Sequence, residues 1–267
     1  MSMPEAVALQ FQQHGEPDSE PLMLLHGLYG SGSNWARIAP TLAERFRVIV
    51  PDLRNHGVSP HHAEMSYPAM VADVLALLDL LDIERAHILG HSMGGKVAMH
   101  CALQAEHRLR RLIIADMAPR AYDGVEHQSI IDAMRQLDLT TLKSRRDADQ
   151  ALAAAVPVQA VRQFLLTNLQ RRDKDWCWRL PLATLRDQLA AIVGWSTAGE
   201  SFDGPTLFLH GGRSDYLGPG DQAAIETLFP RARLRCMENC GHWLHVEDPT
   251  TFGEEVIHFL ENSVESG

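Results

Sequence analysis

Residues 86–97, AHILGHSMGGKV, decide the fold. The apolar run 86–90 predicts a buried strand, and a helical pattern follows over 93–106. Between them, GHSMG at 90–94 has the spacing G-x-S-x-G. A sharp strand-to-helix turn exposes the serine hydroxyl, the flanking glycines avoid side-chain clashes, and the helix N-terminus favours developing negative charge. We therefore take Ser92 as the candidate nucleophile.

Short apolar runs alternate with helical patterns along most of the chain. Runs that are apolar on both faces are typical of buried parallel strands, so the pattern predicts an α/β protein with a mostly parallel, doubly wound sheet. Besides 86–90, strands are expected at 22–25, 48–50, 112–115, 206–209 and 234–237, and helices at 67–83, 93–106, 219–229 and 249–261.

The alternation stops between residues 120 and 200, where no convincing strand is found. Helical patterns occupy 129–137, 148–155, 158–169 and 182–193. We interpret 120–200 as a helical cap inserted into a core formed by 1–119 and 201–267. The cap carries 11 Lys and Arg against 10 Asp and Glu, whereas the rest carries 13 against 24. A near-neutral cap on an acidic body favours anionic substrates, although a solvated helical surface is the simpler explanation.

Composition limits the classes of protein. The 267 residues carry a net charge of −10 and are 45% apolar, which is an ordinary globular balance, and the length predicts one large domain or a domain with an insertion. The acidity argues against nucleic acid as a partner. The N-terminus lacks the features of a signal peptide, and no apolar run is long enough for a membrane span. A cytoplasmic protein, as a monomer or small homo-oligomer, is expected.

The sequence gives no support for a metal site. The four cysteines, Cys101, Cys177, Cys236 and Cys240, form no C-x-x-C pair, and no second Cys or His pair has ligand spacing. Free thiols are expected, and H-E-x-x-H is absent, which argues against a zinc protease. We therefore expect no metal and no organic cofactor.

Two further segments supply partners for Ser92. His242 follows the last expected strand and precedes the last helix, where the fold delivers a histidine to the carboxyl edge of the sheet, so His242 is the candidate base. HGLYG at 26–30 follows the first strong strand and is similar to loops that supply a backbone N–H to an oxyanion. Leu28 and Met93 are the expected oxyanion donors.

The acid has two candidates. Asp116 ends a strand beside that of Ser92, and Asp215 lies after the strand 206–209. The common spacing from His210 falls on Ser214, so Asp215 is one residue late. Both obey the chain order serine, aspartate, histidine. The residues alone leave both open.

A nucleotide-binding alternative fails at one position. Residues 90–97 nearly match G-x-x-x-x-G-K-[ST], but the eighth residue, Val97, has no hydroxyl for Mg²⁺. An NTPase is therefore disfavoured. Lys96 is expected to be an exposed or partly paired helix residue.

These motifs together resemble the α/β-hydrolase fold over essentially the whole chain, and more closely the YbfF-type esterase branch of the abhydrolase proteins. The matching segments are HGLYGSGSNW (26–35), PDLRNHGVSP (51–60), SYPAM (66–70), GHSMGGK (90–96), IADMAP (114–119), IVGW (192–195) and GHWLHVEDP (241–249). The pairing of LRNHG with GHSMGGK is more specific than G-x-S-x-G alone.

The resemblance implies a carboxylesterase that acts on short- to medium-chain acyl esters, and also on acyl thioesters. It further implies the acid position after the sixth strand, which is Asp116, with Ser214 as an auxiliary in the histidine network. The adjacent Asp215 departs from that pattern and keeps the usual position as an alternative. We expect His56, in the loop RNHG (54–57), to have a structural role.

The expected reaction is hydrolysis of a small acyl ester through a Ser92 acyl-enzyme. Apolar cap residues would either line an acyl pocket or simply pack the cap on the core: Phe164, Leu165, Trp176, Trp178 and Trp195. Alternatives are C–C bond hydrolysis or perhydrolysis on the same residues, or a non-catalytic ligand-binding protein on a hydrolase fold.

Overall fold

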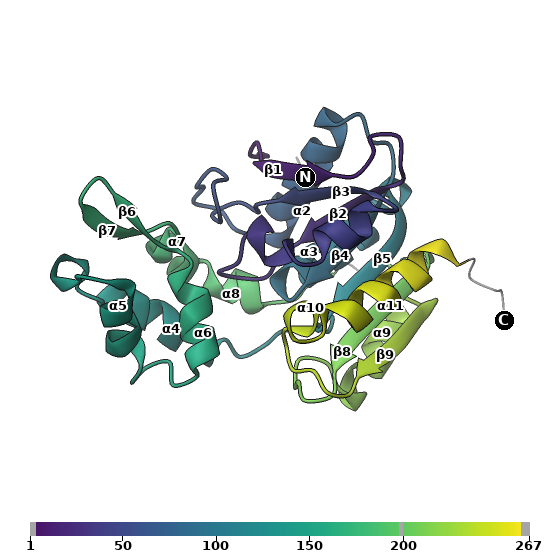
Figure 1. The fold of residues 1–267 in the computed structure, drawn as a ribbon. Helices are drawn as coiled ribbons and strands as arrows, with labels where there is room; N and C mark the ends of the chain where they lie inside the picture. The colour runs from purple at the N-terminus through teal and green to yellow at the C-terminus, as the bar shows by residue number, and fades with distance from the viewer. Residues whose placement is uncertain (1–3, 198–199, 263–267) are drawn as a thin grey trace.

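The computed structural model describes residues 4–197 and 200–262. A seven-stranded sheet lies at its centre (Figure 1). The strands are β1 (Phe11–His14), β2 (Pro21–Leu25), β3 (Arg47–Pro51), β4 (Ala86–His91), β5 (Leu109–Ala115), β8 (Thr206–Gly211) and β9 (Ala232–Met237). Their order is β1-β3-β2-β4-β5-β8-β9, and only β1 pairs antiparallel in this sheet over the described residues. The predicted mostly parallel sheet is confirmed.

Helices cover both faces of the sheet. One face carries α2 (Tyr67–Leu80), α3 (Met93–Gln104) and α9 (Gln222–Leu228), and the other carries α1 (Ala39–Ala43), α10 (Leu244–Glu247) and α11 (Pro249–Glu261). Short 3-10 helices η1 (Gly32–Trp35), η2 (Glu106–Arg108) and η4 (Pro219–Asp221) lie in the connections of this part of the chain, and η3 (Leu139–Thr141) lies between residues 120 and 200. Each helix presents its apolar side to one face of the sheet.

Alternate residues of each inner strand feed two separate cores. In β2, Met23 and Leu25 pack with α2 and α3, while Leu22 and Leu24 pack with α1 and α11. All four side chains are fully buried. Because burying a leucine or methionine contributes about 1.5–3 kcal/mol, a strand apolar on both faces stabilises both layers at once.

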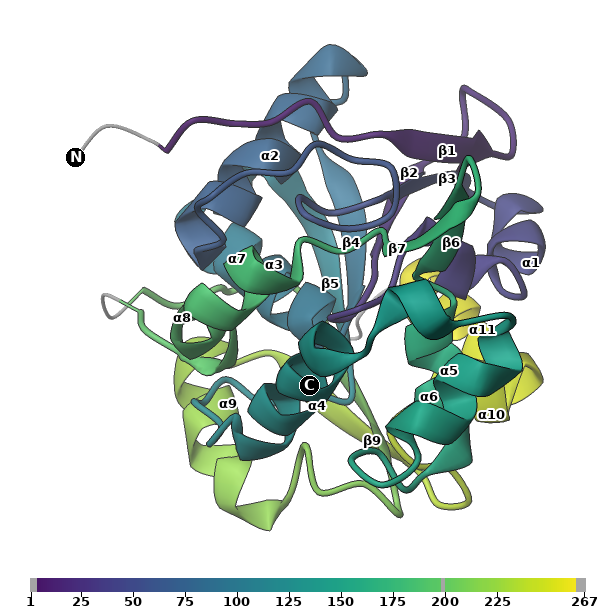
Figure 2. The ribbon, with the colours of Figure 1, turned by 90° about the vertical axis from the view of Figure 1, so that its left-hand side faces the viewer.

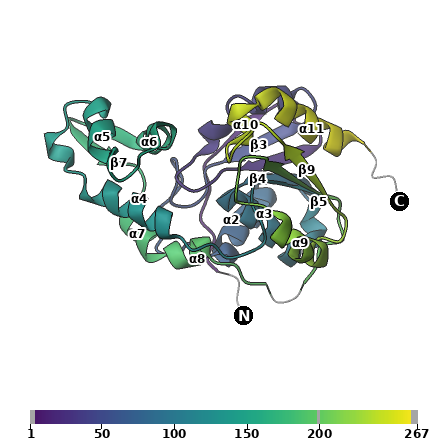
Figure 3. The same ribbon diagram turned by 90° about the horizontal axis from the view of Figure 1, so that it is seen from below.

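Residues 120–197 lie to one side of the sheet, as Figures 1 and 3 show, and in front of it in Figure 2. Their elements are α4 (Val125–Gln136), α5 (Arg145–Leu152), α6 (Gln159–Leu166), β6 (Leu169–Arg172), β7 (Asp175–Trp178), α7 (Leu182–Asp187) and α8 (Leu189–Val193). We call this set the cap elements. The segment is mainly helical, as predicted.

The expectation of no strand in this segment was wrong. β6 and β7 form an antiparallel hairpin that pairs Leu169 with Trp178. The two-residue turn places Asp173 at φ 55°, a left-handed conformation that aspartate tolerates. The hairpin has no continuous apolar run, because polar residues share its strands with the apolar residues that pack against α5 and α6.

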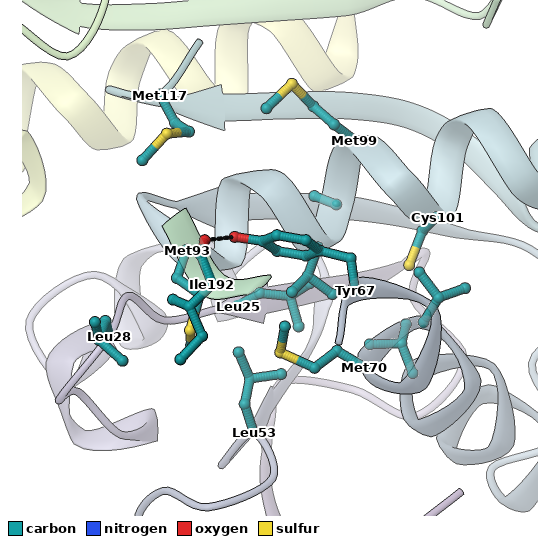
Figure 4. Close-up of a cluster of buried hydrophobic side chains, with 14 of the residues drawn as sticks. Leu25, Leu28, Leu53, Tyr67, Met70, Met93, Met99, Cys101, Met117 and Ile192 are labelled. Carbon is teal, nitrogen blue, oxygen red and sulfur yellow. Dashed lines mark hydrogen bonds between the residues drawn. The ribbon is translucent and has the colours of Figure 1, made fainter. Parts of the chain in front are cut away.

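One hydrogen bond joins α8 to the sheet-covering helix α2. The Tyr67 hydroxyl donates to the carbonyl oxygen of Ile192. Figure 4 shows the tyrosine pointing at Ile192 above Met70 and beside Met93. The last cap helix is thus fixed beside the first turn of α3. Among the described helices, none is both long and apolar enough to cross a membrane.

A buried ion pair holds the loop after β3. Arg54 and Asp73 are both fully buried and meet at two distances, 2.6 Å for Nε–Oδ2 and 2.8 Å for Nη2–Oδ1. The Arg54 Nη1 also donates to the carbonyl oxygen of Glu64 at 2.9 Å, and Asp73 Oδ1 accepts from the amide of Val7 at 2.7 Å. The pair therefore joins α2, the loop and the N-terminal segment.

Removing one partner of this pair will strongly destabilise the protein. Asp73→Ala leaves a buried guanidinium uncompensated, so the free energy of unfolding should fall by ~3–5 kcal/mol. The control is Glu261→Ala, which breaks the exposed pair with Arg45 and should cost less than about 1 kcal/mol. Urea unfolding measures both, and equal losses would contradict the importance of the buried pair.

Candidate active site

Ser92 lies at a strained turn between β4 and α3. Its φ of 54° and ψ of −120° are unusual for a residue with a side chain, and such strain costs about 1–3 kcal/mol. A Cβ on Gly90 would lie 2.1 Å from the carbonyl oxygen of Gly94, and a Cβ on Gly94 would lie 2.3 Å from that of Leu25. Only glycine fits at either position. The G-x-S-x-G spacing thus has the strand–turn–helix context that it predicts.

Asp116 and His242 meet although 126 positions separate them in the chain. His242 Nδ1 lies 2.7 Å from Asp116 Oδ2, and with its proton on Nδ1 the imidazole donates to the carboxylate. Asp116 is fully buried, with φ 51°, directly after β5. The ring nitrogen Nε2 is then left as a proton acceptor, which is the state a general base requires.

Ser214 completes the surroundings of this carboxylate. Its hydroxyl donates to Asp116 Oδ2, and the amide of Gly211 donates to Oδ1 at 3.0 Å. The structure therefore brings Asp116, Ser214 and His242 together. Asp215, in contrast, is exposed, and its backbone carbonyl accepts from Arg120 at 3.3 Å. Among the described residues, the carboxylate that contacts the His242 ring is that of Asp116.

Two residues that hold His242 were not found by sequence reasoning. The Tyr216 ring stacks on the imidazole, with 3.9 Å between ring centres and 21° between planes. His91 Nε2 donates to the carbonyl oxygen of His242 at 2.8 Å. His91 is the second residue of the GHSMG motif, so one turn positions the candidate nucleophile and the histidine loop. No sequence pattern predicts the role of Tyr216, because its contact with His242 forms only where two loops meet in the folded chain.

The HGLYG loop approaches Ser92 closely. A Cβ on Gly27 would lie 3.1 Å from the Ser92 Cβ. His26 Nδ1 donates to the carbonyl oxygen of Gly27 at 2.8 Å, and the amide of Tyr29 donates to His56 Nε2 at 3.1 Å. His56 is buried and fixes the loop, in agreement with its expected structural role. Leu28 lies between these two anchors.

The cavity above Ser92 has two lobes that share Ser92, His242, Leu28 and Tyr216. The first lobe, about 590 Å³, has a mixed lining, whose polar residues include Lys96, Arg120, Tyr122 and Asp123. The second lobe, about 330 Å³, is mainly apolar and is lined by Ile130, Val161, Phe164, Trp243 and Val246 among others. We call them the polar lobe and the apolar lobe.

Of the apolar cap residues considered for a pocket, Phe164 lines the apolar lobe. Leu165 is fully buried in the main core. Trp176 and Trp178 pack within the cap, where their indole N–H groups donate to the carbonyl oxygens of Leu142 and Met134, both at 3.0 Å. Trp195 packs against His100. For these four residues, packing accounts for the apolar side chain, and none of the four lines either lobe.

Lys96 differs from its expected exposure. It is only 1% exposed, and its Nζ donates to the carbonyl oxygens of Val193 and Gly194, each at 2.8 Å. Of the two expected alternatives, an exposed residue was wrong, because the cap elements cover this turn of α3, whereas the two hydrogen bonds agree with a partly paired residue. The near match to G-x-x-x-x-G-K singles out this lysine for nucleotide binding, which Val97 argues against because it has no hydroxyl for Mg²⁺.

Several histidines around the site are buried in the neutral form. Burial lowers the pKa of His26, His100 and His127 to about 4, and that of His56 and His245 to about 3. Burial also lowers the pKa of His91 well below its usual value, and the charge of protonated His242 adds to this effect. Of these rings, those of His26, His56 and His91 support the site as neutral hydrogen-bonding groups.

Within residues 4–197 and 200–262, no group of three or more His, Cys, Asp and Glu side chains is arranged to hold a metal ion. Cys236 and Cys240 are free thiols, as are Cys101 and Cys177.

Known proteins share this arrangement of sheet, turn and loops. The model of the alpha/beta hydrolase fold family matches residues 20–249, and the chain therefore belongs to that family.

The relatives that the chain matches include a lipase and esterases. The chain is 38% identical to the "sn-1-specific diacylglycerol lipase ABHD11" of Danio rerio over 92% of this chain and 80% of the lipase. It is 34% identical to "Esterase YbfF" of Escherichia coli K12 over 92% and 94% of the two chains. The solved structure "Marine microorganism esterase" superposes with a TM-score of 0.91 at 36% identity, covering 95% of this chain and all of that one.

The buried neutral histidines predict a loss of stability in mild acid. Histidines of the unfolded chain bind protons near pH 6.5, whereas the folded protein lowers the pKa of five of these rings to about 3 or 4 and that of His91 well below its usual value. Unfolding therefore takes up protons in this window, and stability present above pH 6.5 is lost as the pH falls, by up to ~1.4 kcal/mol per pH unit for each ring.

We expect the free energy of unfolding to drop by at least about 3 kcal/mol between about pH 6.8 and about pH 5.2, above the range where ordinary carboxylates titrate. Urea unfolding at a series of pH values measures it. A flat profile across this window would show that the buried rings are protonated in the folded protein.

Proposed function

We propose that the protein is a serine carboxylesterase that hydrolyses short- to medium-chain acyl esters through an acyl-enzyme on Ser92. The observation that carries the proposal is the buried Asp116 carboxylate, 2.7 Å from His242 Nδ1, in a cavity that His242 shares with the strained Ser92. The esterase and lipase relatives support the same class of reaction.

In the first step, His242 Nε2 accepts the proton of the Ser92 hydroxyl as its oxygen attacks the ester carbonyl carbon. Asp116 stabilises the resulting imidazolium and fixes the tautomer with Nε2 unprotonated. Ser214 and the Gly211 amide keep the carboxylate oriented toward Nδ1. His242 then returns the proton to the departing alcohol, which leaves Ser92 acylated.

The tetrahedral oxyanion is stabilised by the amides of Leu28 and Met93 in this proposal. Met93 is the first residue of α3, where backbone N–H groups have no acceptor within the helix and the helix dipole favours negative charge. Gly27 brings the HGLYG loop against Ser92 from the other side. Such a donor contributes about 3 kcal/mol to the transition state in enzymes where it has been removed.

In the second step, water attacks the acyl carbonyl, with His242 acting as general base again. The apolar lobe supplies a site for the acyl chain, because its aliphatic and aromatic lining matches a hydrocarbon. Its volume of about 330 Å³ is the reason for proposing short to medium chains. Acyl thioesters follow as a further substrate class, since the same acyl-enzyme forms when a thiol leaves.

Replacement of Ser92 by alanine is expected to abolish hydrolysis of p-nitrophenyl butyrate, with kcat reduced at least about 10³-fold and the fold retained. The control is Ser201→Ala, an exposed serine of the described chain, which should leave kcat unchanged. Steady-state kinetics with a thermal unfolding scan checks both variants. Turnover that survives in the Ser92 variant would exclude this mechanism.

The two candidate acids are separated by a matched pair of substitutions. Asp116→Asn should reduce kcat by about 10⁴-fold, because the amide no longer holds His242 in the required tautomer. Asp215→Asn should change kcat by less than about threefold, because this side chain is exposed. The ratio of the two kcat values on p-nitrophenyl butyrate is the readout. A larger loss for Asp215→Asn would reassign the acid.

A further inference from the structure

Lys96 is a buried cation beside the nucleophile that the esterase mechanism does not use. It stands four residues after Ser92 on α3, and its amide donates to the carbonyl oxygen of Ser92 at 3.1 Å. Helix side chains tilt toward the N-terminal end, so this lysine extends toward the end of α3 that carries Ser92. It lines the polar lobe with Ser92.

The ammonium group is held by neutral partners. Two of its three N–H donors go to the carbonyl oxygens of Val193 and Gly194, at the end of α8. The ring of Tyr122 lies 4.8 Å from Nζ, and that of Tyr67 lies 5.8 Å away. Lys96 takes part in none of the ion pairs found over residues 4–197 and 200–262.

Other charges of the polar lobe do not neutralise this one. Arg120 is paired with Asp221 at 2.9 Å and Arg213 with Glu247 at 3.2 Å. The carboxylates of the lobe, those of Asp123, Glu126 and Asp215, belong to exposed residues. Water screens exposed charges, whereas a buried ammonium without a counter-ion is costly. Burial, followed by the charge of Arg120, lowers the pKa of Lys96 to about 7. An anion bound in the lobe would supply the missing charge.

We propose that Lys96 determines specificity for the leaving group: it binds an anionic group on the alcohol half of the ester, while the acyl half occupies the apolar lobe. The two lobes share Ser92 and His242, so the two halves of one ester extend from the scissile carbonyl in different directions. This inference rests on the proposed esterase function.

The test uses two esters of the same size and shape. Both carry a butyryl group, one on the phenol of 4-hydroxyphenylacetate and the other on that of 4-hydroxyphenylacetamide. The leaving phenols have similar reactivity, because a methylene separates the ring from the carboxylate or amide. The ratio of kcat/KM for the anionic ester to that for the neutral ester therefore measures recognition of the charge.

Lys96→Met removes the charge and keeps most of the side-chain length. We expect the kcat/KM ratio to fall by about tenfold or more, as for the loss of a hydrogen bond to a charged group. The matched control is Tyr67→Phe, which removes the hydroxyl that ties α2 to Ile192 but leaves Lys96 in place. If the lysine only held α8 in place, each variant would change kcat/KM for the two esters by the same factor, and the kcat/KM ratio would stay as in the wild-type protein.

Inhibition of the wild-type protein gives a second readout that needs no variant. The product 4-hydroxyphenylacetate should inhibit hydrolysis of the neutral ester at a concentration about tenfold lower than 4-hydroxyphenylacetamide does. Equal inhibition, or an unchanged ratio in Lys96→Met, overturns this inference while leaving the esterase proposal intact. Hydrolysis of neither ester by the wild-type protein overturns both.

Discussion

The site depends on the close approach of two backbone segments at Gly90 and Gly94. No side chain fits at either position, because the carbonyl oxygens of Gly94 and Leu25 lie where a Cβ would stand. This contact permits the left-handed turn at Ser92 and starts α3 one residue later. It also places His91 beneath the histidine loop, where Nε2 holds the carbonyl of His242. The proposed nucleophile and the proposed base are therefore positioned by the same turn.

The buried polar groups form a second layer of support. Asp116 is fully buried, yet both of its oxygens accept hydrogen bonds. The neutral rings of His26 and His56 fix the HGLYG loop through backbone contacts. Buried polar groups without hydrogen-bond partners would destabilise the fold at these positions, whereas groups with partners define one arrangement of the loops. The loop and strand ends thus hold the residues of the proposed chemistry, and the cap elements shape the cavity above them.

Much of the fold could be predicted, because the inner strands are apolar on both faces and the helices have clear periods. The edge strand β1 was missed, since FQQH is half-buried and has no apolar run. The helix expected over 182–193 is interrupted at Gln188 and forms α7 and α8. The hairpin of the cap depends on tertiary packing of Trp178 rather than on a local pattern.

In the site, too, some residues could be predicted from the sequence and others depend on contacts between distant segments. Ser92, His242 and the two acid candidates follow from motifs and chain order, but the choice of Asp116 over Asp215 depends on where β5 and the histidine loop end in space. Tyr216 and the buried state of Lys96 could not be predicted, since each depends on a contact between distant segments.

The central claim is that Ser92 carries the acyl group between the two steps. The direct measurement is mass spectrometry of the protein mixed with p-nitrophenyl butyrate and quenched in acid within the first turnover. The account predicts a peptide containing Ser92 that is heavier by one butyryl group and absent when substrate is omitted. Butyryl on a different residue, or rapid hydrolysis with no acylated protein at any quench time, would contradict it.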